Sequence, residues 1–459
     1  MKRKIKRILS KLKNLLQLSK PFTPPATAIN TIPSQTILAP RSSRRRPAVK
    51  DNKSQLNAPL EKLPPEVRRQ LLSILELEEL NTLVHASPVF YQQYLLDRKY
   101  LLCKSLEKTL CGVTTDAYAV YQSGLADFAN TRTREGVSQF LKVYQDQCSS
   151  AQYSILTESL TEDAAVGMAT FVFSIIKPLV GHYTRWALAN LANETGNSHS
   201  HEPLSKTEEI RLMRALYRFQ LCCNLFGNNH YRTSWQIDLR FMSHDILNIF
   251  FCIFEPWEVE EIACIHTFVK EKYDQIFRDI YWDVHKENPK FKGQRPITPE
   301  GAFDLDESWT RDMLLIGTVS HGLELLHTTL FKIRDHAHLV STMQEHIKWP
   351  AGYFLEDEAL GETAQYWRRQ ERLSDRDHKQ ERRDPLPFQG DRGSRPPLAW
   401  TLIWRETYSN LYGSYIQDDI RRWGYVMWDA ARLQNTGAKE VLARQWEAKW
   451  RDSDPRDNV

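Results

Sequence analysis

Histidine, which can transfer protons near neutral pH and bind metals, is concentrated in one region of this sequence. Five histidines lie in this stretch: His321, His327, His336, His338 and His346. A metal or catalytic site would also need acidic or thiolate partners in an ordered arrangement, and the HExxH pattern of zinc hydrolases is absent. We therefore interpret these histidines as exposed or internally hydrogen-bonded, and we predict no metal site and no catalytic residue.

Cysteine, the other candidate ligand and nucleophile, is spread along the chain. The seven cysteines are an odd number, and no pair has the CxxC spacing of zinc and redox sites. Most of them fall on the apolar faces of expected helices. This pattern predicts buried free thiols in a reducing compartment, with neither a disulfide framework nor a structural zinc site.

Motifs for other classes of reaction are also missing. The sequence contains no phosphate-binding GxxxxGK[ST] or GxGxxG loop, no GxSxG nucleophile motif and no set of kinase motifs. The paired carboxylates Asp418 and Asp419 are followed closely by arginines, so we expect them to form surface ion pairs. We therefore predict that the protein is not an enzyme and has no cofactor.

The elements that would position any site are predicted to be helices. The 459 residues are 41% apolar and 11% aromatic, which is enough for a large core, and no run of alternating residues indicates strands. The longest helical pattern starts at Pro256 and stops at Asn288, so we expect it to be the spine of the body. The aromatic residues of 398–434 recur close to helical spacing and are expected to belong to the core.

The segment 162–193 is apolar enough to raise the question of a membrane span. Lys177 and Pro178 interrupt it, which leaves less than the ~20 residues that crossing a bilayer requires. We therefore expect a buried helix or a pair of buried helices here, within a soluble body.

The stretch 60–94 has the strongest local pattern and predicts three short amphipathic helices. Pro64 and Pro65 suit the first turn of a helix, where a missing N–H costs nothing. Ser87 and Pro88 form a capping residue with a proline after it, which starts the third helix. The apolar faces are formed by Val67, Leu71, Ile74, Leu75, Leu80, Leu83, Val84, Phe90 and Tyr94. A unit of about forty residues cannot bury this much apolar surface internally, so the excess should face the rest of the chain or another protein.

This pattern resembles the F-box. The resemblance rests on Leu63-Pro64-x-Glu66-Val67, Leu71 and Leu75, Glu79-Leu80-x-x-Leu83, and Ala86-Ser87-x-x-Phe90, and it covers residues 59–98. The Ala-Ser-Pro-x-Phe variant is similar to the form common in filamentous fungi. The segment RWGYVMWD at 422–429 is similar to the ending of many fungal F-box-like proteins. Glu79 stands where an Asp is usual, a change that keeps the charge.

The resemblance implies a protein-interaction adaptor. The residues that would form the binding surface or its supporting core are Leu63, Pro64, Val67, Leu71, Leu75, Leu80, Leu83 and Phe90. This surface would dock onto the Skp-family linker of a cullin–RING, SCF-type ubiquitin ligase, and through it onto the cullin. The body would select a substrate protein for ubiquitin-dependent degradation. Other subunits would transfer the ubiquitin, so the resemblance implies no catalytic residue in this chain.

The N-terminal region differs from the rest of the chain in charge. Residues 1–50 contain 13 Lys or Arg and no Asp or Glu, while the whole chain carries a net charge of +4, so the remainder is about nine units negative (+4 − 13 = −9). Residues 1–20 have the spacing of a basic amphipathic helix. Four readings stay open: a membrane-surface helix, a mitochondrial presequence, a nuclear import signal and a tail with no targeting role. We expect the protein in the cytoplasm, the nucleus or both, with the mitochondrial alternative open.

We therefore expect an all-α protein with an irregular helical body. The predicted parts are a disordered basic tail and linker (1–57), an F-box-like domain (58–111), an α-helical body (112–452) with flexible loops at about 194–206 and 372–397, and a disordered end (453–459). Two alternatives to the adaptor remain. One is an α-helical scaffold without a ligase role, in which the F-box-like unit packs permanently against the body. The other is a tail that binds nucleic acid or an anionic membrane.

Overall fold

The computed structural model is all-α, which confirms the predicted fold class. It describes residues 59–130, 132–149, 160–196, 202–227, 241–293, 301–350, 355, 359–371, 373–451 and 453–457. The predicted tail and linker at 1–57 lie outside the described residues. Within the ranges above, β-type pairing is limited to two isolated bridges, His285–Phe303 and Pro385–Thr407.

The chain divides into two compact units, residues 1–101 and 102–459. The division falls inside helix α5 (Arg98–Thr109). The helices of the first unit before α5 are η1 (Pro59–Lys62), α2 (Pro65–Ser73), α3 (Leu77–Ala86) and α4 (Pro88–Leu96). Helices α2, α3 and α4 are the three short helices that the pattern of residues 60–94 predicts.

The starts of these helices follow from their local sequence. Pro65 is the first residue of α2, where its missing N–H has no partner to lose. The Glu79 carboxylate accepts a hydrogen bond of 3.1 Å from the backbone N–H of Glu76, which closes the first turn of α3. The Ser87 hydroxyl accepts a hydrogen bond of 3.4 Å from the backbone N–H of Phe90 and caps α4.

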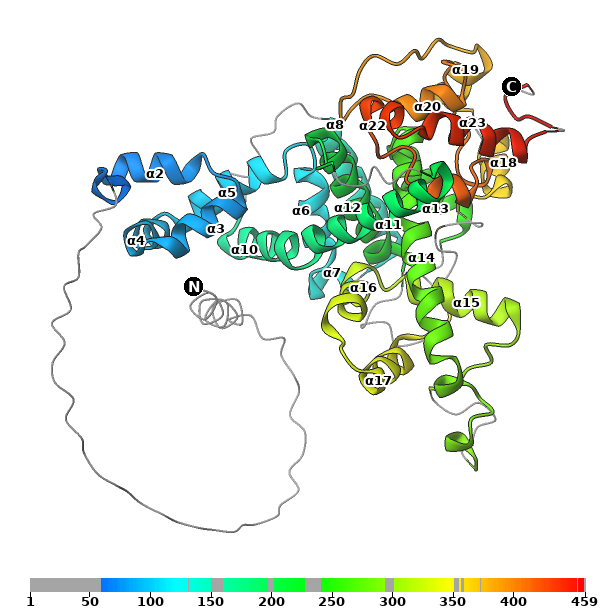
Figure 1. The fold of residues 1–459 in the computed structure, drawn as a ribbon, viewed down its shortest axis with the longest axis horizontal. Helices are drawn as coiled ribbons and strands as arrows, with labels where there is room; N and C mark the ends of the chain where they lie inside the picture. The colour runs from blue at the N-terminus through cyan, green and yellow to red at the C-terminus, as the bar shows by residue number, and fades with distance from the viewer. Residues whose placement is uncertain are drawn as a thin grey trace. The chain divides into compact units, whose positions relative to one another are not determined.

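The second unit contains the remaining helices (Figure 1). They are α6 (Thr114–Ser123), α7 (Ala126–Asn130), α8 (Arg134–Ser149), α10 (Glu162–Phe171), η2 (Val172–Ile176), α11 (Lys177–Thr195), α12 (Lys206–Phe226), α13 (Ser243–Ile249), η4 (Phe251–Ile253), α14 (Pro256–Val284), η5 (Pro289–Phe291), α15 (Ser308–Val319), α16 (Leu323–His327), η6 (Thr328–Lys332), α17 (His336–His346), α18 (Glu362–Glu371), α19 (Asp375–Glu381), α20 (Leu398–Ile403), η7 (Gly413–Tyr415), α21 (Asp418–Arg422), α22 (Ala430–Asn435) and α23 (Ala438–Lys449).

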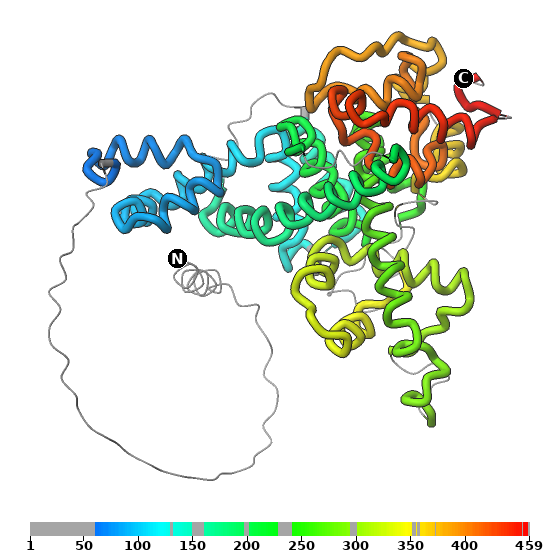
Figure 2. The backbone as a smooth tube through the Cα atoms, in the orientation of Figure 1, coloured from blue at the N-terminus to red at the C-terminus, as the bar shows by residue number. Residues whose placement is uncertain are grey.

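Helix α14 is the spine of this unit, as its sequence pattern predicts. It is 29 residues long and has buried side chains on almost every turn. Figure 2 shows α14 as the long green run, and it packs against α12, α15, α17 and α21. One helix therefore contacts segments that lie before it and after it in the sequence.

The apolar segment is one continuous helical run, Glu162–Thr195, so of the two predicted alternatives, one helix or a pair, the single helix is correct. A π-helical stretch, Val172–Ile176, lies directly before Lys177 and Pro178. Such a widened turn accommodates a residue that cannot donate the usual backbone hydrogen bond. By length and composition this run could cross a membrane. Half of its most apolar 18-residue segment is buried inside the structure, however, and core helices of other proteins can be equally long and apolar.

The C-terminal aromatic segment belongs to the core, as predicted. The side chains of Trp400, Trp423 and Trp428 are fully buried. Gly424 lies between two of them with φ +68°, and a Cβ at this position would lie 2.7 Å from the Tyr183 hydroxyl. Only glycine fits both the backbone conformation and the close approach, which explains the glycine of the RWGYVMWD segment.

The charged stretch at 372–397, expected to be a flexible loop, contains helix α19. The Arg368 guanidinium donates two hydrogen bonds of 2.7 Å to the Asp377 carboxylate, and both side chains are buried. Asn410 donates a further bond of 2.8 Å to Asp377. Low apolar content suggested a solvated loop, but charges that pair with one another can be buried without apolar neighbours.

Candidate protein-binding surface

The first unit has its own small hydrophobic core. Leu72, Leu80, Val84, Phe90 and Leu101 are buried and in contact. The residues packed against them with partial burial are Leu71, Leu75, Leu83, Tyr91, Tyr94 and Tyr100. Five of the eight predicted site residues thus lie in or against this core: Leu71, Leu75, Leu80, Leu83 and Phe90. These five therefore belong to the supporting core and not to the exposed surface.

The other predicted site residues lie outside this core. Val67 is 46% exposed, Pro64 is exposed and Leu63 is half-buried. Two residues that the predicted site leaves out are also exposed, Leu60 at 51% and Ile74 at 56%. We call Leu60, Leu63, Pro64, Val67 and Ile74 the outer residues of the first unit. They form a cluster in sequence at η1 and α2, and three of them are large apolar side chains in contact with solvent.

The spacing along α2 explains this division. Val67 lies in α2, Ile74 is the residue that caps the C-terminus of α2, and Leu72 follows Val67 by five positions, which is about 140° further around the helix. Leu72, between them in sequence, is fully buried and faces the core. The spacing was visible in the sequence, but which side of α2 faces the core was not, because both sides of α2 carry apolar residues.

Polar contacts fix the turn between η1 and α2, which we call the corner and which contains Leu63 and Pro64. The Ser87 hydroxyl donates a hydrogen bond of 2.6 Å to the Glu61 carboxylate, which ties η1 to the start of α4. The Arg68 guanidinium donates a bond of 3.2 Å to the Glu61 carbonyl. The corner therefore has a defined conformation before any partner binds, which lowers the entropic cost of association.

A second exposed apolar pair lies at the end of α4, where Leu95 is 47% and Leu96 80% exposed. Nearby, the Arg69 guanidinium lies 4.4 Å from the centroid of the Tyr100 ring and 3.3 Å from the Asp97 carboxylate. The predicted site residues do not include this pair. Two consecutive leucines are no signal of exposure in themselves, because Leu325 and Leu326 of the short helix α16 are both buried.

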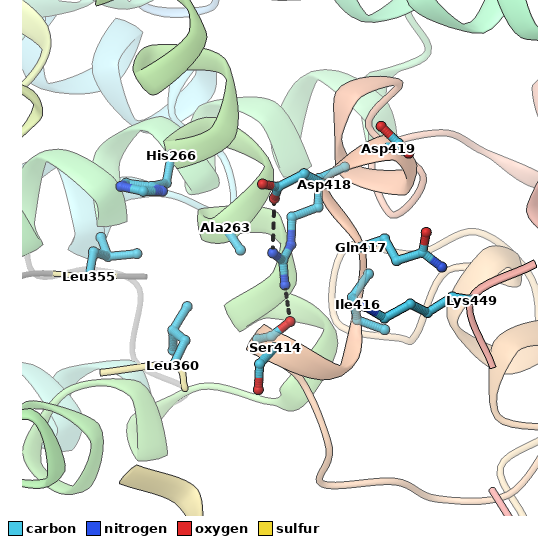
Figure 3. A pocket seen from close by; sticks show the side chains of 12 residues that line it. Ala263, His266, Leu355, Leu360, Ser414, Ile416, Gln417, Asp418, Asp419 and Lys449 are labelled. Carbon is cyan, nitrogen blue, oxygen red and sulfur yellow. Dashed lines mark hydrogen bonds and ion pairs between the residues drawn. The ribbon is translucent and has the colours of Figure 1, made fainter. Parts of the chain in front are cut away.

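Figure 3 shows a pocket of about 350 Å³ in the second unit, with His266, Leu355 and Leu360 on one side and Gln417 and Lys449 on the other. Two of its charged lining groups, Arg421 and Asp418, are paired with each other, and Arg421 also pairs with Glu260, which does not line the pocket. The Arg421 guanidinium lies 3.3 Å from the Asp418 carboxylate and 3.0 Å from that of Glu260. Burial raises the pKa of the Asp418 carboxyl, but the Arg421 charge outweighs this and the pKa falls below its usual value.

The two carboxylates predicted to form surface ion pairs have different surroundings. Asp419 pairs with Arg422 at 3.4 Å, and both side chains are more than half exposed, as predicted. Asp418 pairs with Arg421, whose side chain is only 9% exposed. The prediction for Asp418 is therefore half wrong, since its partner belongs to the interior.

The five clustered histidines do not share one position. His336 is exposed and lies 2.8 Å from the Asp283 carboxylate, while His338 is exposed at the start of α17. The rings of His321 and His346 are in edge contact with centroids 5.4 Å apart. Burial and the nearby Lys332 lower the pKa of His327, which favours its neutral form.

Another group, His285, Asp304 and Asp306, brings possible metal-ligand atoms within 4.8 Å of one another. The backbone N–H of Glu287 donates to His285 Nδ1 at 3.2 Å, so the ring proton is on Nε2, which donates to Asp306 at 3.0 Å. The Lys286 ammonium group forms an ion pair with the Asp304 carboxylate. A cation would have to displace both the proton on His285 Nε2 and the Lys286 ammonium group. We therefore assign a structural role to these residues, in which they join the end of α14 to residues 304–306.

The thiols are free, as predicted. Cys103, Cys222, Cys223 and Cys264 are buried, Cys252 is partly buried, and the remaining two are exposed. Burial raises the pKa of Cys222, Cys223 and Cys264 well above its usual value. A buried thiol of this kind is largely protonated and a poor nucleophile.

Comparison with known proteins gives no relative. No family model matches the chain, and no curated protein or solved structure is significantly similar to it. The outer residues of the first unit are therefore the strongest candidate for a functional surface, on their geometry alone.

Proposed function

We propose that this protein is an F-box-type adaptor that docks onto the Skp-family linker of a cullin–RING ubiquitin ligase. The observation that carries the proposal is the exposure of Leu60, Val67 and Ile74 on a small unit whose core cluster does not include them. The resemblance of residues 59–98 to an F-box supplies the identity of the partner. The adaptor would work in the cytoplasm or nucleus, and its substrate is a protein.

The chemistry of the surface supports protein binding. A single large apolar side chain at 46–56% exposure is common on protein surfaces and needs no partner. Several such side chains close together in the sequence favour a partner protein that covers them. Buried on association, each contributes about 25 cal/mol per Å² of apolar area removed from water. The fixed corner at Glu61 and Ser87 presents them in one conformation.

The larger unit would select the substrate. Most turns of its long helix α14 are buried, and aromatic and charged side chains are among the buried residues of this unit, which suits a rigid platform. The adaptor proposal assigns it no chemical step, since ubiquitin transfer belongs to other subunits of such a ligase.

The proposal is tested by substituting one outer residue and measuring binding to the linker. Val67→Asp places a charge where the partner would bury an apolar side chain, and we expect the linker and cullin to be lost from an affinity purification of the full chain, a fall of at least about tenfold. Leu63→Ala with Pro64→Ala should weaken binding in the same direction.

The matched control is Leu402→Asp, at a leucine of the second unit that is 37% exposed. It adds the same charge at a similar solvent-facing position and should leave linker binding unchanged. Equal recovery of the linker with the wild type and a folded Val67→Asp variant would rule out docking through this face. Absence of the linker from the wild-type purification would favour the scaffold alternative.

A further inference from the structure

Basic and aromatic side chains lie together in the larger unit where α11, α14 and the run from α16 to η6 meet. The ring centroid of His182 lies 5.6 Å from that of Phe331 and 5.8 Å from that of Phe268. The rings of His327 and Phe331 have centroids 5.0 Å apart. The Lys272 ammonium group lies 5.9 Å from the centroid of the Phe268 ring. Segments far apart in the sequence therefore contribute to one surface.

The charges on this surface are positive. We call Arg185, Lys272 and Lys332 the basic face; Arg185 and Lys332 are exposed, and Lys272 is half-buried. Burial lowers the pKa of His182, and the charges of Lys272 and Arg185 lower it further. Lys332 acts in the same direction on His327. Cations from three segments therefore act on two neighbouring histidines.

The basic face has no counter-ion of its own. Within the part of the chain that the structure describes, no carboxylate forms an ion pair with Arg185, Lys272 or Lys332. The Arg185 guanidinium donates a hydrogen bond of 3.2 Å to the carbonyl of Gly181, a neutral group of its own helix. These cations are therefore available to an anionic partner, which would gain electrostatic complementarity without displacing an internal ion pair.

The carboxylate of Glu271, which precedes Lys272 in the sequence, is already bonded to two other groups. It accepts a hydrogen bond of 3.0 Å from the Trp186 indole and lies 3.1 Å from the Arg422 guanidinium. Burial lowers the pKa of Lys272, and the charge of Glu271 does not offset this, so the pKa stays below its usual value. A further anion beside Lys272 would stabilise its charged form.

The surroundings favour a short acidic segment over a nucleic acid. After residue 50 the chain is about nine units negative (+4 − 13 = −9), so the basic face is a local exception, and a long polyanion would extend onto a protein of its own charge. Single-strand binding also uses aromatic rings with free faces for stacking. Here Phe268 is buried, and His182 and Phe331 are half-buried against each other.

We propose that the basic face binds an acidic segment of a partner protein, whose carboxylates pair with Arg185, Lys272 and Lys332. The rings between the cations would contact the aliphatic parts of the same segment. The proposal does not depend on the adaptor function, because every residue that carries it lies within the second unit.

Peptide binding to the full-length chain tests the proposal. In the background for all measurements, the 13 Lys and Arg of residues 1–50 are replaced with Gln, because the basic tail would itself bind an acidic peptide. The probes are a short fluorescein-labelled peptide of alternating Glu and Asp and its counterpart of alternating Gln and Asn. We expect a saturable change in fluorescence anisotropy with the acidic peptide alone, and weaker binding as salt is added.

Substitutions at exposed positions test the location. Arg185→Glu with Lys332→Glu replaces two attractive contacts with two repulsive ones, so the affinity for the acidic peptide should fall at least about tenfold. Lys272→Gln should weaken binding in the same direction. The matched control is Lys142→Glu with Lys292→Glu, at exposed lysines on α8 and after η5. It changes the net charge equally and should bind the peptide as the background does.

Several results would overturn the proposal. They are the absence of binding by the acidic peptide, equal binding of the two peptides, undiminished binding to a folded Arg185→Glu, Lys332→Glu variant, and an equal loss in the control. Tighter binding of a single-stranded oligothymidine, lost in the same variant, would assign the face to nucleic acid instead. Circular dichroism checks that each variant is folded. If the double variant does not fold, Lys272→Gln decides, because it removes one charge and keeps a long polar side chain.

Discussion

At the scale of single residues, several charged side chains of this protein are buried in the core, and Glu260 and Arg421 are one such pair. The Glu260 side chain is fully buried on α14, and Arg421 donates two hydrogen bonds of 3.0 Å to it. The backbone N–H of Gly413 donates a further bond of 2.7 Å. A buried carboxylate is tolerated because its oxygens are bonded, and each partner depends on the other.

Substituting one member of this pair should lower the free energy of unfolding far more than replacing both members with apolar residues. Arg421→Met leaves Glu260 buried without its counter-charge, and we expect the free energy of unfolding to fall by about 3–5 kcal/mol. The double variant Arg421→Met with Glu260→Leu should recover much of that loss. Denaturant unfolding measures both.

The neighbouring Arg422 provides the control. It forms an exposed pair with Asp419 in which both side chains are more than half exposed, so Arg422→Met should cost less than about 1 kcal/mol. If Arg421→Met and Arg422→Met were equally mild, the buried pair would not contribute as described.

Glu258 gives the stability a pH dependence. Burial raises the pKa of this carboxyl, but Arg218 and Arg214 outweigh burial and lower the pKa to about 2. A carboxyl whose pKa is lower in the folded state stabilises the protein above its unfolded pKa of about 4.5, and the contribution is lost as the pH falls towards 2. The difference corresponds to about 3 kcal/mol.

We therefore expect Glu258→Gln to lower the free energy of unfolding at pH 7 and to converge with the wild type as the pH falls from 5 to 2. Urea unfolding at a series of pH values measures this. Glu345 is exposed on α17, so Glu345→Gln should run parallel to the wild type across the range. A constant gap between Glu258→Gln and the wild type would show that the carboxyl does not act through its ionisation.

At the scale of elements, two helical glycines have opposite roles. Gly317 lies inside α15, where a Cβ would fall 1.8 Å from the backbone oxygen of Lys348. Gly181 lies inside α11, and a Cβ there would have no neighbour within 4 Å. The first glycine allows a close approach of two chain segments, while the second only weakens its helix.

Substitution by alanine should therefore change stability in opposite directions. Gly317→Ala should lower the free energy of unfolding by about 1–3 kcal/mol, because the backbone of Lys348 must move. Gly181→Ala should raise it by about 0.5–1 kcal/mol through helix propensity. Thermal unfolding of the two variants gives the comparison, and a shift of both in the same direction would contradict this account of α15.

At the scale of the whole molecule, the larger unit is completed by its C-terminal segment. Trp400, Trp423 and Trp428 are fully buried, and α21 packs against α14 while α23 packs against α11. The segment after residue 397 thus supplies part of the core and is not an appendage.

Deleting residues 398–459 should leave the larger unit without a packed core. We expect the loss of near-ultraviolet circular dichroism with retained helical signal, and binding of a hydrophobic dye. Deleting residues 457–459 removes the exposed Arg405–Asp457 pair and should cost less than about 1 kcal/mol. A cooperative unfolding transition in the longer deletion would show that this segment is dispensable.

The sequence by itself determined the features that depend on neighbouring residues. The all-α class, the start of α4 at Ser87 and Pro88, the long helix from Pro256 and the burial of the aromatic C-terminal segment all followed from period, capping and composition. Each of these depends on interactions within a few turns of one chain segment, so local patterns were sufficient.

Only the tertiary structure decided which apolar residues remain exposed and which charges are buried. Val67 and Leu72 have similar side chains on one helix, yet one faces solvent and the other the core, because the position of α3 and α4 selects the face. Arg421 and Glu260 are far apart in sequence, and no local pattern predicts that they meet.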